Sequence, residues 1–478
     1  MAGELVPIRV LPGLPRLFID YVCDFERVGD LFAHDFHDPA AFDRAAETAA
    51  ARDLPREELA DLLLAQNRHF GSGGPALANA RLLADPDAVA VVTGQQPGLF
   101  GGPLYNLYKA ATAIRLAGAL AARTGRPHVP VFWIASDDHQ VGEVDHVYGL
   151  DRDGGPVRIS WARGASRRIE PIAALCLDDG VVAALDRVAE ISHGLRHRQD
   201  VLALLADCFR PGERLAHAFA RLAARLFEPD GLVLVESSDP ALRRLGMPRL
   251  APELAYPSPA TAAARLATER LAARGYPVQV PLRDDSLNLF FGRRERFRIR
   301  SGPDGFRVEL RSSVVDVETL RARFDTEVEQ FSPNVLLRPL YQDALFPTVA
   351  YVAGPSEIAY FAQLAPVYER FGIPMPVVYP RKSVTLLDEK VASLLHASEL
   401  RVEDVLAGAE APAAVVASLL PDGQPQERVL GLVHALLVGG LELVPALVSG
   451  LALEEFDHQV LDVGAAPPAV VASGANAG

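Results

Sequence analysis

One stretch of the chain, residues 88–135, constrains the fold more than any other part of the sequence. It begins with the continuous apolar run AVAVV, passes through the glycine-rich turn TGQQPGLFGG, continues with the helical pattern PLYNLYKAATAIRLAGALAAR and ends with a second apolar run, VPVFWIA. Short, continuous apolar runs are typical of strands that are buried on both faces of a parallel sheet. The order strand, glycine loop, helix, strand therefore predicts an α/β fold built on a parallel sheet.

Three further strands of the same kind follow along the chain. Their sequences are GLVLV at 231–235, PTVAYVAG near residue 350 and PVVY at 376–379. The gaps between the second, third and fourth strands exceed an ordinary crossover, so we expect two insertions into one sheet. The second insertion carries GYPVQVPL, NLFFGRRERFRIRS and FRVELRSS, which alternate like the strands of antiparallel hairpins.

The two ends of the chain have the periodicity of helices. Apolar residues recur at steps of three and four before Arg81, where Asp38 is a candidate helix cap, and the chain after Val384 is also predicted to be helical. The predicted divisions are a helical segment at 1–80, the first half of the core at 81–148, a first insertion at 149–215, a core continuation at 216–256, a second insertion at 257–330, the second half of the core at 331–384, a helical region at 385–462 and a disordered tail at 463–478.

Composition narrows the classes of function. The 478 residues carry 47 Lys and Arg against 61 Asp and Glu, a net charge of −14, which argues against broad nucleic-acid binding. Cys23, Cys176 and Cys208 lack zinc-site spacing and are too few for a disulfide framework, so we interpret them as buried apolar residues. The most apolar stretch, GLVHALLVGGLELVPALVSG, is interrupted by polar residues and predicts a pair of core helices, not a membrane span. We therefore expect a soluble, cytoplasmic protein.

The glycine-rich turn is the first candidate site, because ligands of open parallel sheets bind at the carboxyl ends of the strands. Its glycine spacing fits neither the dinucleotide fingerprint nor the Walker loop. The helix that follows offers free N–H groups to a phosphate or carboxylate, and Lys109 shares a helix face with Tyr105. The alternative is a tight turn without a ligand. The candidate binding residues of this segment are Gly94, Gln95, Gln96, Gly101, Gly102, Tyr105, Asn106 and Lys109.

The second candidate is the sequence SDDH at the end of VPVFWIA. Asp137 or Asp138 would orient the imidazole of His139, which would then act as a general acid or base. Two alternatives stay open: Ser136 or Asp137 caps a short helix, or the carboxylates bind a divalent metal with other groups nearby. The nearby groups available for a metal are Glu143, Asp145 and His146.

Two more strand ends carry polar residues that suit either a ligand or a purely structural role. They are Gly354, Ser356 and Glu357 after PTVAYVA, and Arg381, Lys382 and Ser383 after PVVY. The first group would cap a helix or contact a ligand, and the second would hold phosphate charge or form a solvated basic loop. We expect the basic cluster at 293–296 to be solvated, and His69 and His217 to be isolated structural histidines.

Taken together, these segments resemble one protein family. The stretch VVTGQQPGLFGGPLYNLYKAATAIRLA followed by VPVFWIASDDHQVGEVDHV is similar to the cysteine-adding enzymes of bacillithiol biosynthesis, the BshC family. The pattern of that family is a TGQQ stretch, then GPLY with a downstream lysine, then PVFW and an acidic-Asp-His tripeptide. The resemblance extends to FSPNVLLRPLYQDALFPTVAYVAGPSEIAYFAQL, PRKS and LLPDGQPQERVLG, so it spans most of the chain in order.

The resemblance implies a Rossmann-like core with inserted connecting segments and a helical coiled coil. It also implies the last step of bacillithiol synthesis, in which L-cysteine is joined to glucosaminyl-malate through an amide. By analogy with class I aminoacyl-tRNA synthetases, it implies ATP with accompanying Mg²⁺ and no tightly bound metal. In that analogy GGPLYNLYK stands at the first synthetase signature and PRKS at the second, and Trp133 belongs to the binding residues.

Two features depart from the family pattern. Asp137 stands where the family usually has Glu, and Gln140 stands where it has Asp. The segment between PRKS and QER is too short for three heptads, so we expect a shortened or missing coiled coil. If that coil forms the family's dimer, this protein is either a monomer or pairs differently.

The leading hypothesis is an amide-forming ligase that activates the carboxylate of cysteine. Lys109 would hold nucleotide phosphate, and His139 would take the proton from the attacking amine. Arg381 and Lys382 would neutralise charge on the α-phosphate. Two other classes stay open: a synthetase-like nucleotidyltransferase acting on another amino acid, and a non-catalytic family member that binds a sugar-malate or a pathway partner.

Overall fold

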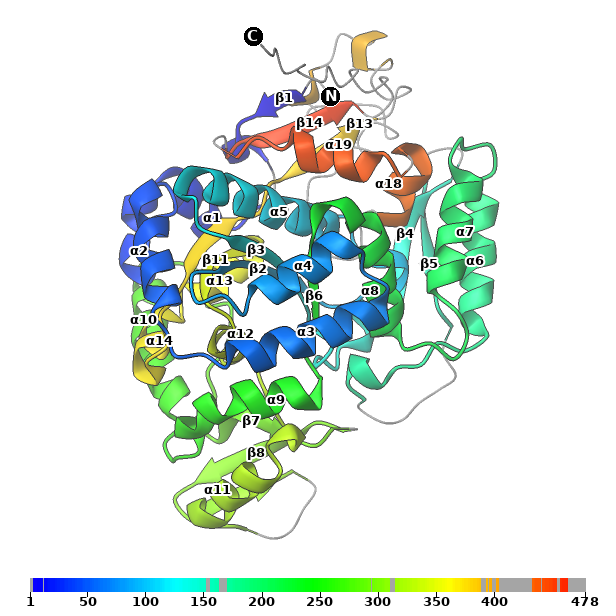
Figure 1. Cartoon of the computed structure of the whole chain (residues 1–478). Helices are drawn as coiled ribbons and strands as arrows, with labels where there is room; N and C mark the ends of the chain where they lie inside the picture. Colours follow the sequence, from blue (N-terminus) through cyan, green and yellow to red (C-terminus); the bar gives the residue numbers. More distant parts are fainter. Residues whose placement is uncertain are drawn as a thin grey trace, which may run out of the picture.

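A five-stranded parallel sheet forms the centre of the computed structural model (Figure 1). In sheet order its strands are β12 (Val377–Pro380), β11 (Thr348–Ala353), β2 (Val89–Gln95), β3 (His128–Ile134) and β6 (Val233–Glu236). Every ladder between them is parallel. All residues of β3 and β11 are buried, which explains their continuous apolar sequences. The predicted α/β class and the five predicted strands are confirmed.

The structure describes most of the chain up to residue 387 and short parts beyond it. The described residues are 3–11, 13–151, 155–162, 170–293, 295–309, 314–387, 393, 395–397, 401–403, 432–439, 441–453 and 456–462. The predicted tail at 463–478, the QER segment and most of the region predicted to hold the shortened coiled coil lie outside these residues.

The order of the strands reverses between β2 and β11. The chain first adds β3 and β6 on one side of β2, and later adds β11 and β12 on the other side. In open parallel sheets, loops diverge at such a reversal and leave a crevice at the carboxyl ends of the strands. A Cβ at Gly94, near the end of β2, would lie 2.7 Å from the carbonyl oxygen of Trp133, so this glycine allows β2 and β3 to approach closely.

Helices pack against the sheet. Helix α5 (Tyr105–Thr124) contacts β2 and β3, α3 (Arg56–Phe70) contacts β6, and α2 (Pro39–Ala50) contacts β11. Helix α2 begins after Asp38, whose carboxylate accepts a hydrogen bond from the N–H of Ala40, as predicted. Further α-helices before residue 387 are α1 (Arg16–Cys23), α4 (Gly74–Leu82), α8 (Leu215–Leu226), α9 (Pro240–Gly246), α10 (Pro259–Ala273), α12 (Arg338–Leu345), α13 (Pro355–Phe361) and α14 (Ala365–Phe371). Of these, α10 lies in the second predicted insertion.

Antiparallel strands occur in both predicted insertions. The first contains the hairpin β4 (His146–Leu150) and β5 (Pro156–Ser160) with helices α6 (Gly180–Ile191) and α7 (Arg198–Cys208). The second contains β7 (Ser286–Phe291), β8 (Phe297–Gly302) and β9 (Gly305–Val308), which β10 (Phe331–Pro333) joins, with helix α11 (Val317–Thr326); it forms the lower end of the molecule in Figure 1. GYPVQVPL forms no strand, because the N–H and carbonyl of Val280 bond to the side chain of Gln363 instead of to a ladder.

A small sheet joins the two ends of the chain. Strand β1 (Gly3–Val6) pairs antiparallel with β14 (His458–Asp462), which pairs parallel with β13 (Val384–Leu387). Strands of four or five residues show too little alternation to be separated from helical sequence, and the prediction of helical ends missed this sheet. The predicted pair of core helices is present as α18 (Leu432–Gly439) and α19 (Leu443–Gly450). None of the described helices combines the length and apolarity that a membrane span requires.

Candidate active site

A cavity of about 460 Å³ lies at the carboxyl ends of β2, β3 and β11, where the strand order reverses. Its walls come from the end of β2, the turn after β3, the β7–β8 hairpin and the start of α12. A pocket at this position with several convergent polar groups is the usual form of a small-molecule site. The predicted site residues that line it are Gly94, Gln95, Gln96, Trp133, Asp137, Asp138, His139 and Glu357.

Asp138 and His139 form the acid–histidine turn at one side of this cavity. The carboxylate of Asp138 accepts hydrogen bonds from Nε2 of Gln96 at 2.8 Å and from the backbone N–H of His139 at 2.6 Å. Nδ1 of His139 lies 3.6 Å from Oδ1 of Asp138. Burial opposes the charge of Asp138, but the charge of Arg338 and these hydrogen bonds outweigh it and hold its pKa below the ordinary value.

The imidazole of His139 is held in its neutral form. Burial, and after it the positive charge of Arg296, lowers the pKa of His139, while the charge of Asp138 opposes this shift. A neutral imidazole beside a carboxylate can accept a proton and keep the resulting charge stable. The turn therefore has the chemistry of a general base with its orienting group.

Asp137 has a different partner from Asp138. Its buried carboxylate pairs with Arg243, whose Nη1 also donates to the carbonyl of Glu329 at 2.8 Å. Ser136 donates to Oε1 of Glu236 at 2.6 Å. Neither Ser136 nor Asp137 caps the short turn Val141–Glu143, which has no side-chain cap, so the capping alternative is wrong. The structure thus pairs His139 with Asp138 and ties Asp137 to helix α9.

The residues proposed for a metal site in the alternative interpretation are separated. Asp145 pairs with His146, with 2.9 Å between Oδ1 and Nδ1, whereas Glu143 lines the cavity. Burial raises the pKa of Glu143, a hydrogen bond from the side chain of Gln96 opposes the shift, and the negative charge of Asp138 adds to it. Among the residues that the structure describes, no group of three or more His, Cys, Asp or Glu side chains could hold a metal ion.

Two arginines, Arg296 and Arg338, also line the cavity, and sequence reasoning did not assign either of them to it. Arg296 donates to Oγ of Ser332 at 3.1 Å and to the carbonyl of Pro333 at 2.8 Å, and its guanidinium stacks over the ring of Phe290 at 4.2 Å. Burial lowers the pKa of Arg296 to about 10, although nearby carboxylates oppose the shift. The expectation that this residue is solvated is therefore wrong, because packing against Phe290 and Ser332 holds it at the cavity.

Arg338 opens helix α12, whose remaining residues are all buried. Its Nη2 donates to the hydroxyl of Tyr360 at 3.3 Å, and it lines the cavity close enough for its charge to act on Asp138. The signal that could have identified it is the sequence RPLYQDAL, in which a cation precedes a buried amphipathic segment within the stretch that resembles the family.

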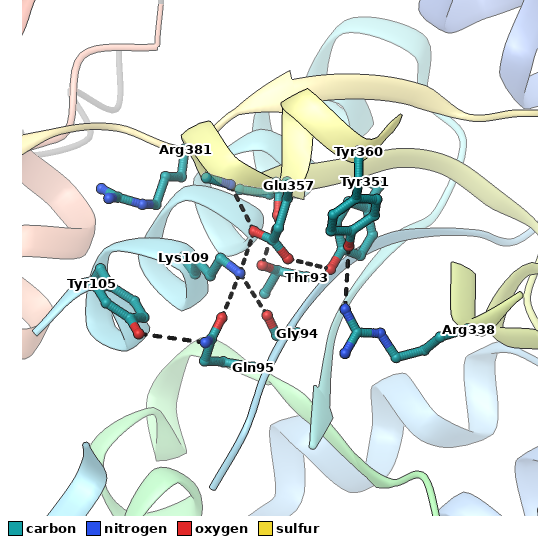
Figure 2. Close-up of polar contacts among 12 residues, drawn as sticks. Thr93, Gly94, Gln95, Tyr105, Lys109, Arg338, Tyr351, Glu357, Tyr360 and Arg381 are labelled. Carbon is teal, nitrogen blue, oxygen red and sulfur yellow. Dashed lines mark hydrogen bonds and ion pairs between the residues drawn. The ribbon is translucent and has the colours of Figure 1, made fainter. Parts of the chain in front are cut away.

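Lys109 lies behind the cavity wall and joins three elements (Figure 2). It is 2% exposed, and its ammonium donates to the carbonyl of Gly94 at 2.7 Å, to Oε1 of Gln95 at 2.9 Å and to Oε2 of Glu357 at 2.5 Å. These contacts use its three N–H donors. Burial lowers the pKa of Lys109 to about 8, opposed by the charge of Glu357. Lys109 therefore connects α5, β2 and α13 rather than lining the cavity.

Glu357 links this network to the cavity. Its carboxylate accepts from the backbone N–H of Gly354 at 2.7 Å, which caps α13, and from the hydroxyl of Tyr351 at 2.8 Å. Both Tyr351 and Glu357 line the cavity, whereas Ser356 is exposed and does not. Figure 2 shows Tyr351 and Tyr360 side by side above Arg338. The predicted cap is present, and the same residue contributes to the wall of the cavity.

The remaining residues of the glycine-rich turn face elsewhere. A Cβ at Gly98 would lie 2.5 Å from Cα of Gly102, so the turn folds tightly on itself. Nδ2 of Asn106 donates to the carbonyl of Gly101 at 3.0 Å, and both residues border a separate, apolar cavity of about 20 Å³. The hydroxyl of Tyr105 accepts from Nε2 of Gln95 at 3.5 Å. Gly94, Gln95 and Gln96, at the start of the turn, thus line the cavity that His139 also lines. The later residues of the turn do not line it.

The cationic turn after β12 does not line the cavity either. Nζ of Lys382 donates to the carbonyl of Leu453 at 2.9 Å and lies 4.0 Å over the ring of Phe456. The guanidinium of Arg381 lies 5.6 Å from the ring centre of Tyr105, and the carbonyl of Ser383 accepts from the N–H of Gln459. The structure therefore brings His139 and Glu357 together, but it places Lys382 against the C-terminal segment.

A second, larger cavity of about 1230 Å³ lies between α3, the first insertion and the β7–β8 hairpin. On its wall His217 contacts His69, with 3.2 Å between Nδ1 and Nε2, and lies 3.5 Å from Glu236, so these histidines are not isolated as expected. Cys176 is exposed here, whereas Cys208 is buried, so the interpretation of all three cysteines as buried is wrong. Arg243 lines this cavity and pairs with Asp137, which lines the smaller one, so the two cavities share a partition.

The fold and the site define an α/β protein with a cavity of small-molecule size at the reversal point of a parallel sheet. A family model described as "Bacillithiol biosynthesis BshC, N-terminal Rossmann-like domain" matches residues 6–382. A relative from Salinibacter ruber is 38% identical over 410 residues, which cover 86% of this chain and 75% of the relative. One from Koribacter versatilis is 36% identical over 436 residues, 90% of this chain and 79% of the relative. Both carry the name "Putative cysteine ligase BshC".

This chain belongs to the BshC family of bacillithiol biosynthesis. The resemblance found in TGQQPG, GPLY and SDDH is confirmed, and the core is Rossmann-like. The match ends at Lys382, shortly before residue 387, after which the structure describes only short segments.

Proposed function

We propose that this protein joins L-cysteine to glucosaminyl-malate through an amide bond, the last step of bacillithiol synthesis. The observation that carries the proposal is the similarity, over most of the chain, to relatives named as cysteine ligases. The cavity supports it, because a neutral histidine with an orienting carboxylate and two arginines face one space. Amide formation needs a base for the attacking amine and positive charge for a carboxylate or phosphate.

In the proposed reaction the amine of the glucosamine attacks the activated carboxyl carbon of cysteine. The C–N bond forms, the bond from that carbon to the leaving oxygen breaks, and the amine gives up a proton. Nε2 of His139 accepts this proton, while Asp138 beside Nδ1 stabilises the imidazolium. The lowered pKa of His139 keeps the base unprotonated near neutral pH before the amine arrives.

A free carboxylate is a poor acyl donor, so the proposal includes ATP as the activating co-substrate. The carboxylate oxygen of cysteine attacks the α-phosphorus of ATP, pyrophosphate leaves, and AMP is later released from the adenylate by the amine. Mg²⁺ enters with the nucleotide in this proposal. The phosphate roles predicted from the sequence for Lys109, Arg381 and Lys382 stay predictions, and the cations that line the cavity are Arg296 and Arg338.

The test is an assay with purified protein, L-cysteine, glucosaminyl-malate and ATP, followed by mass spectrometry for the amide and for the nucleotide products. We expect one AMP and one pyrophosphate for each amide formed. When glucosaminyl-malate is omitted, we expect no sustained release of AMP or pyrophosphate. If the amide forms while ATP is not consumed, the adenylate step is ruled out. Pyrophosphate exchange with another amino acid, and no amide with cysteine, would favour the nucleotidyltransferase alternative.

A further inference from the structure

Opposite charges from different elements line the same cavity. Arg296 and Arg338 lie on the wall formed by the second insertion and α12, and Asp138 and Glu143 lie on the turn after β3. Within the described part of the chain, no ion pair joins either arginine to either carboxylate. The charges nevertheless act on each other at longer range, because Arg338 lowers the pKa of Asp138. The space between the two walls is therefore polarised.

The other charges at the cavity already have partners. The carboxylate of Asp137 pairs with Arg243, and that of Glu357 pairs with Lys109. In contrast, among the described residues Arg338 uses one of its five N–H donors in a side-chain hydrogen bond, to Tyr360. Asp138 and Glu143 accept hydrogen bonds from Gln96, and Arg296 donates to Ser332 and Pro333, but these partners carry no charge. Among the described residues, the two arginines and these two carboxylates are thus the charged groups at the cavity that no Arg–carboxylate or Lys–carboxylate ion pair neutralises.

We propose that this cavity binds a ligand that carries both an ammonium group and a carboxylate, with the ammonium at Asp138 and Glu143 and the carboxylate at Arg296 and Arg338. Such a ligand completes charge-assisted hydrogen bonds on both walls, and arginine is suited to hold a carboxylate through two parallel bonds. This orientation places the ammonium beside His139, where a base can remove its proton.

The inference rests on the proposed function for the identity of the ligand, since both proposed substrates have this chemistry. L-Cysteine carries one ammonium and one carboxylate, and glucosaminyl-malate carries one amine and two carboxylates. Calorimetric titration of the whole protein without ATP distinguishes the two sources. One arm uses L-cysteine, cysteamine and 3-mercaptopropionate, and the other uses glucosaminyl-malate, glucosamine and N-acetylglucosaminyl-malate.

In at least one arm, we expect the ligand with both groups to bind at least about tenfold more tightly than the analogue that lacks either group. The arm that shows this pattern identifies the substrate that occupies the cavity. If both arms show the truncated analogues binding as tightly as the whole ligand, the inference is overturned.

Two variants assign each group of the ligand to its wall. Arg296→Gln is expected to bind the whole ligand no more tightly than the analogue that lacks the carboxylate. Glu143→Gln is expected to bind the whole ligand no more tightly than the analogue that lacks the ammonium group. Arg307→Gln is the matched control, because Arg307 is exposed on β9 and does not line the cavity. A variant that merely unfolds loses both preferences together, and a thermal melt identifies it. Retention of both preferences in both variants would overturn the assignment.

The amide assay separates this inference from the proposed function. If binding shows the expected pattern and no amide forms, the proposed function fails while the inference stands. If amide forms and Arg296→Gln leaves the KM of both substrates unchanged, the inference fails while the proposed function stands.

Discussion

The turns after β3 and β12 both place charged side chains at the carboxyl end of the same parallel sheet, yet only the first lines the cavity of about 460 Å³ that described residues form there. The His139 side chain is 42% exposed, whereas Lys382 is 4% exposed. Strand β3 lies inside the sheet, and the cavity opens at its carboxyl end. Strand β12 is an edge strand, and Leu453 and Phe456 contact the lysine that follows it. A strand end thus marks a candidate site, but the segment that covers it decides whether a ligand can reach it.

The largest effect is expected at the open strand end. His139→Ala removes the proposed base, and we expect kcat for amide formation to fall by about 10²- to 10⁴-fold. Stability should change little, because the ring is half exposed and its contact with Asp138 is 3.6 Å long. His396→Ala, at an exposed histidine, is the control. Unchanged turnover in His139→Ala would remove the catalytic role from this strand end.

Lys109 lies beside the open site but is as buried as Lys382, so it tests whether its role is structural. Lys109→Met leaves the carboxylate of Glu357 without its buried partner. We expect the free energy of unfolding to fall by about 3–5 kcal/mol, measured by urea denaturation. The double variant Lys109→Met with Glu357→Gln should recover part of this loss, because no unpaired charge remains. A single variant as stable as the parent protein would contradict the role of Lys109 as a connector.

A smaller effect is expected at the covered strand end. Lys382→Ala loses the hydrogen bond to Leu453 and the contact with Phe456, and we expect a loss of about 1–3 kcal/mol in stability. Assayed well below its melting temperature, the variant should form amide at a rate within about threefold of that of the parent protein. A threefold change in rate corresponds to less than about 1 kcal/mol in activation free energy. If Lys382→Ala folds but no longer turns over nucleotide, the result would support the phosphate role that the sequence predicts for Lys382. It would also contradict the conclusion that the two strand ends differ in function.

The smallest effect concerns pH. Burial and, after it, the positive charge of Arg296 lower the pKa of His139, so the base is neutral further into acid than an ordinary histidine. kcat/KM should therefore fall only as pH drops through a value below about 6.5. Arg296→Gln removes that charge, so the pKa of His139 should rise and the acid limb should move to higher pH by less than about one unit. The control variant Arg307→Gln should leave the acid limb of the kcat/KM profile in place. If the acid limb of Arg296→Gln moved to lower pH, the expected direction of the pKa shift would be contradicted.

The sequence predicted the five core strands because each is a continuous apolar run, and a strand buried on both faces allows no other pattern. It predicted the acid–histidine turn because SDDH follows such a run directly. It missed the arginine wall, since the environment of Arg296 depends on contacts with Phe290 and Ser332 that no local pattern encodes. It also treated Arg381 and Lys382 as accessible, although a segment some seventy residues later in the chain contacts Lys382.

The most direct measurement of the central claim is a crystal structure of the protein soaked with glucosaminyl-malate. The account predicts ligand density in the cavity of about 460 Å³, with the amine within hydrogen-bond reach of Asp138 or Glu143 and a malate carboxylate on Arg296 or Arg338. Density in the larger cavity beside His217, or against Lys382, with the smaller cavity empty, would contradict it.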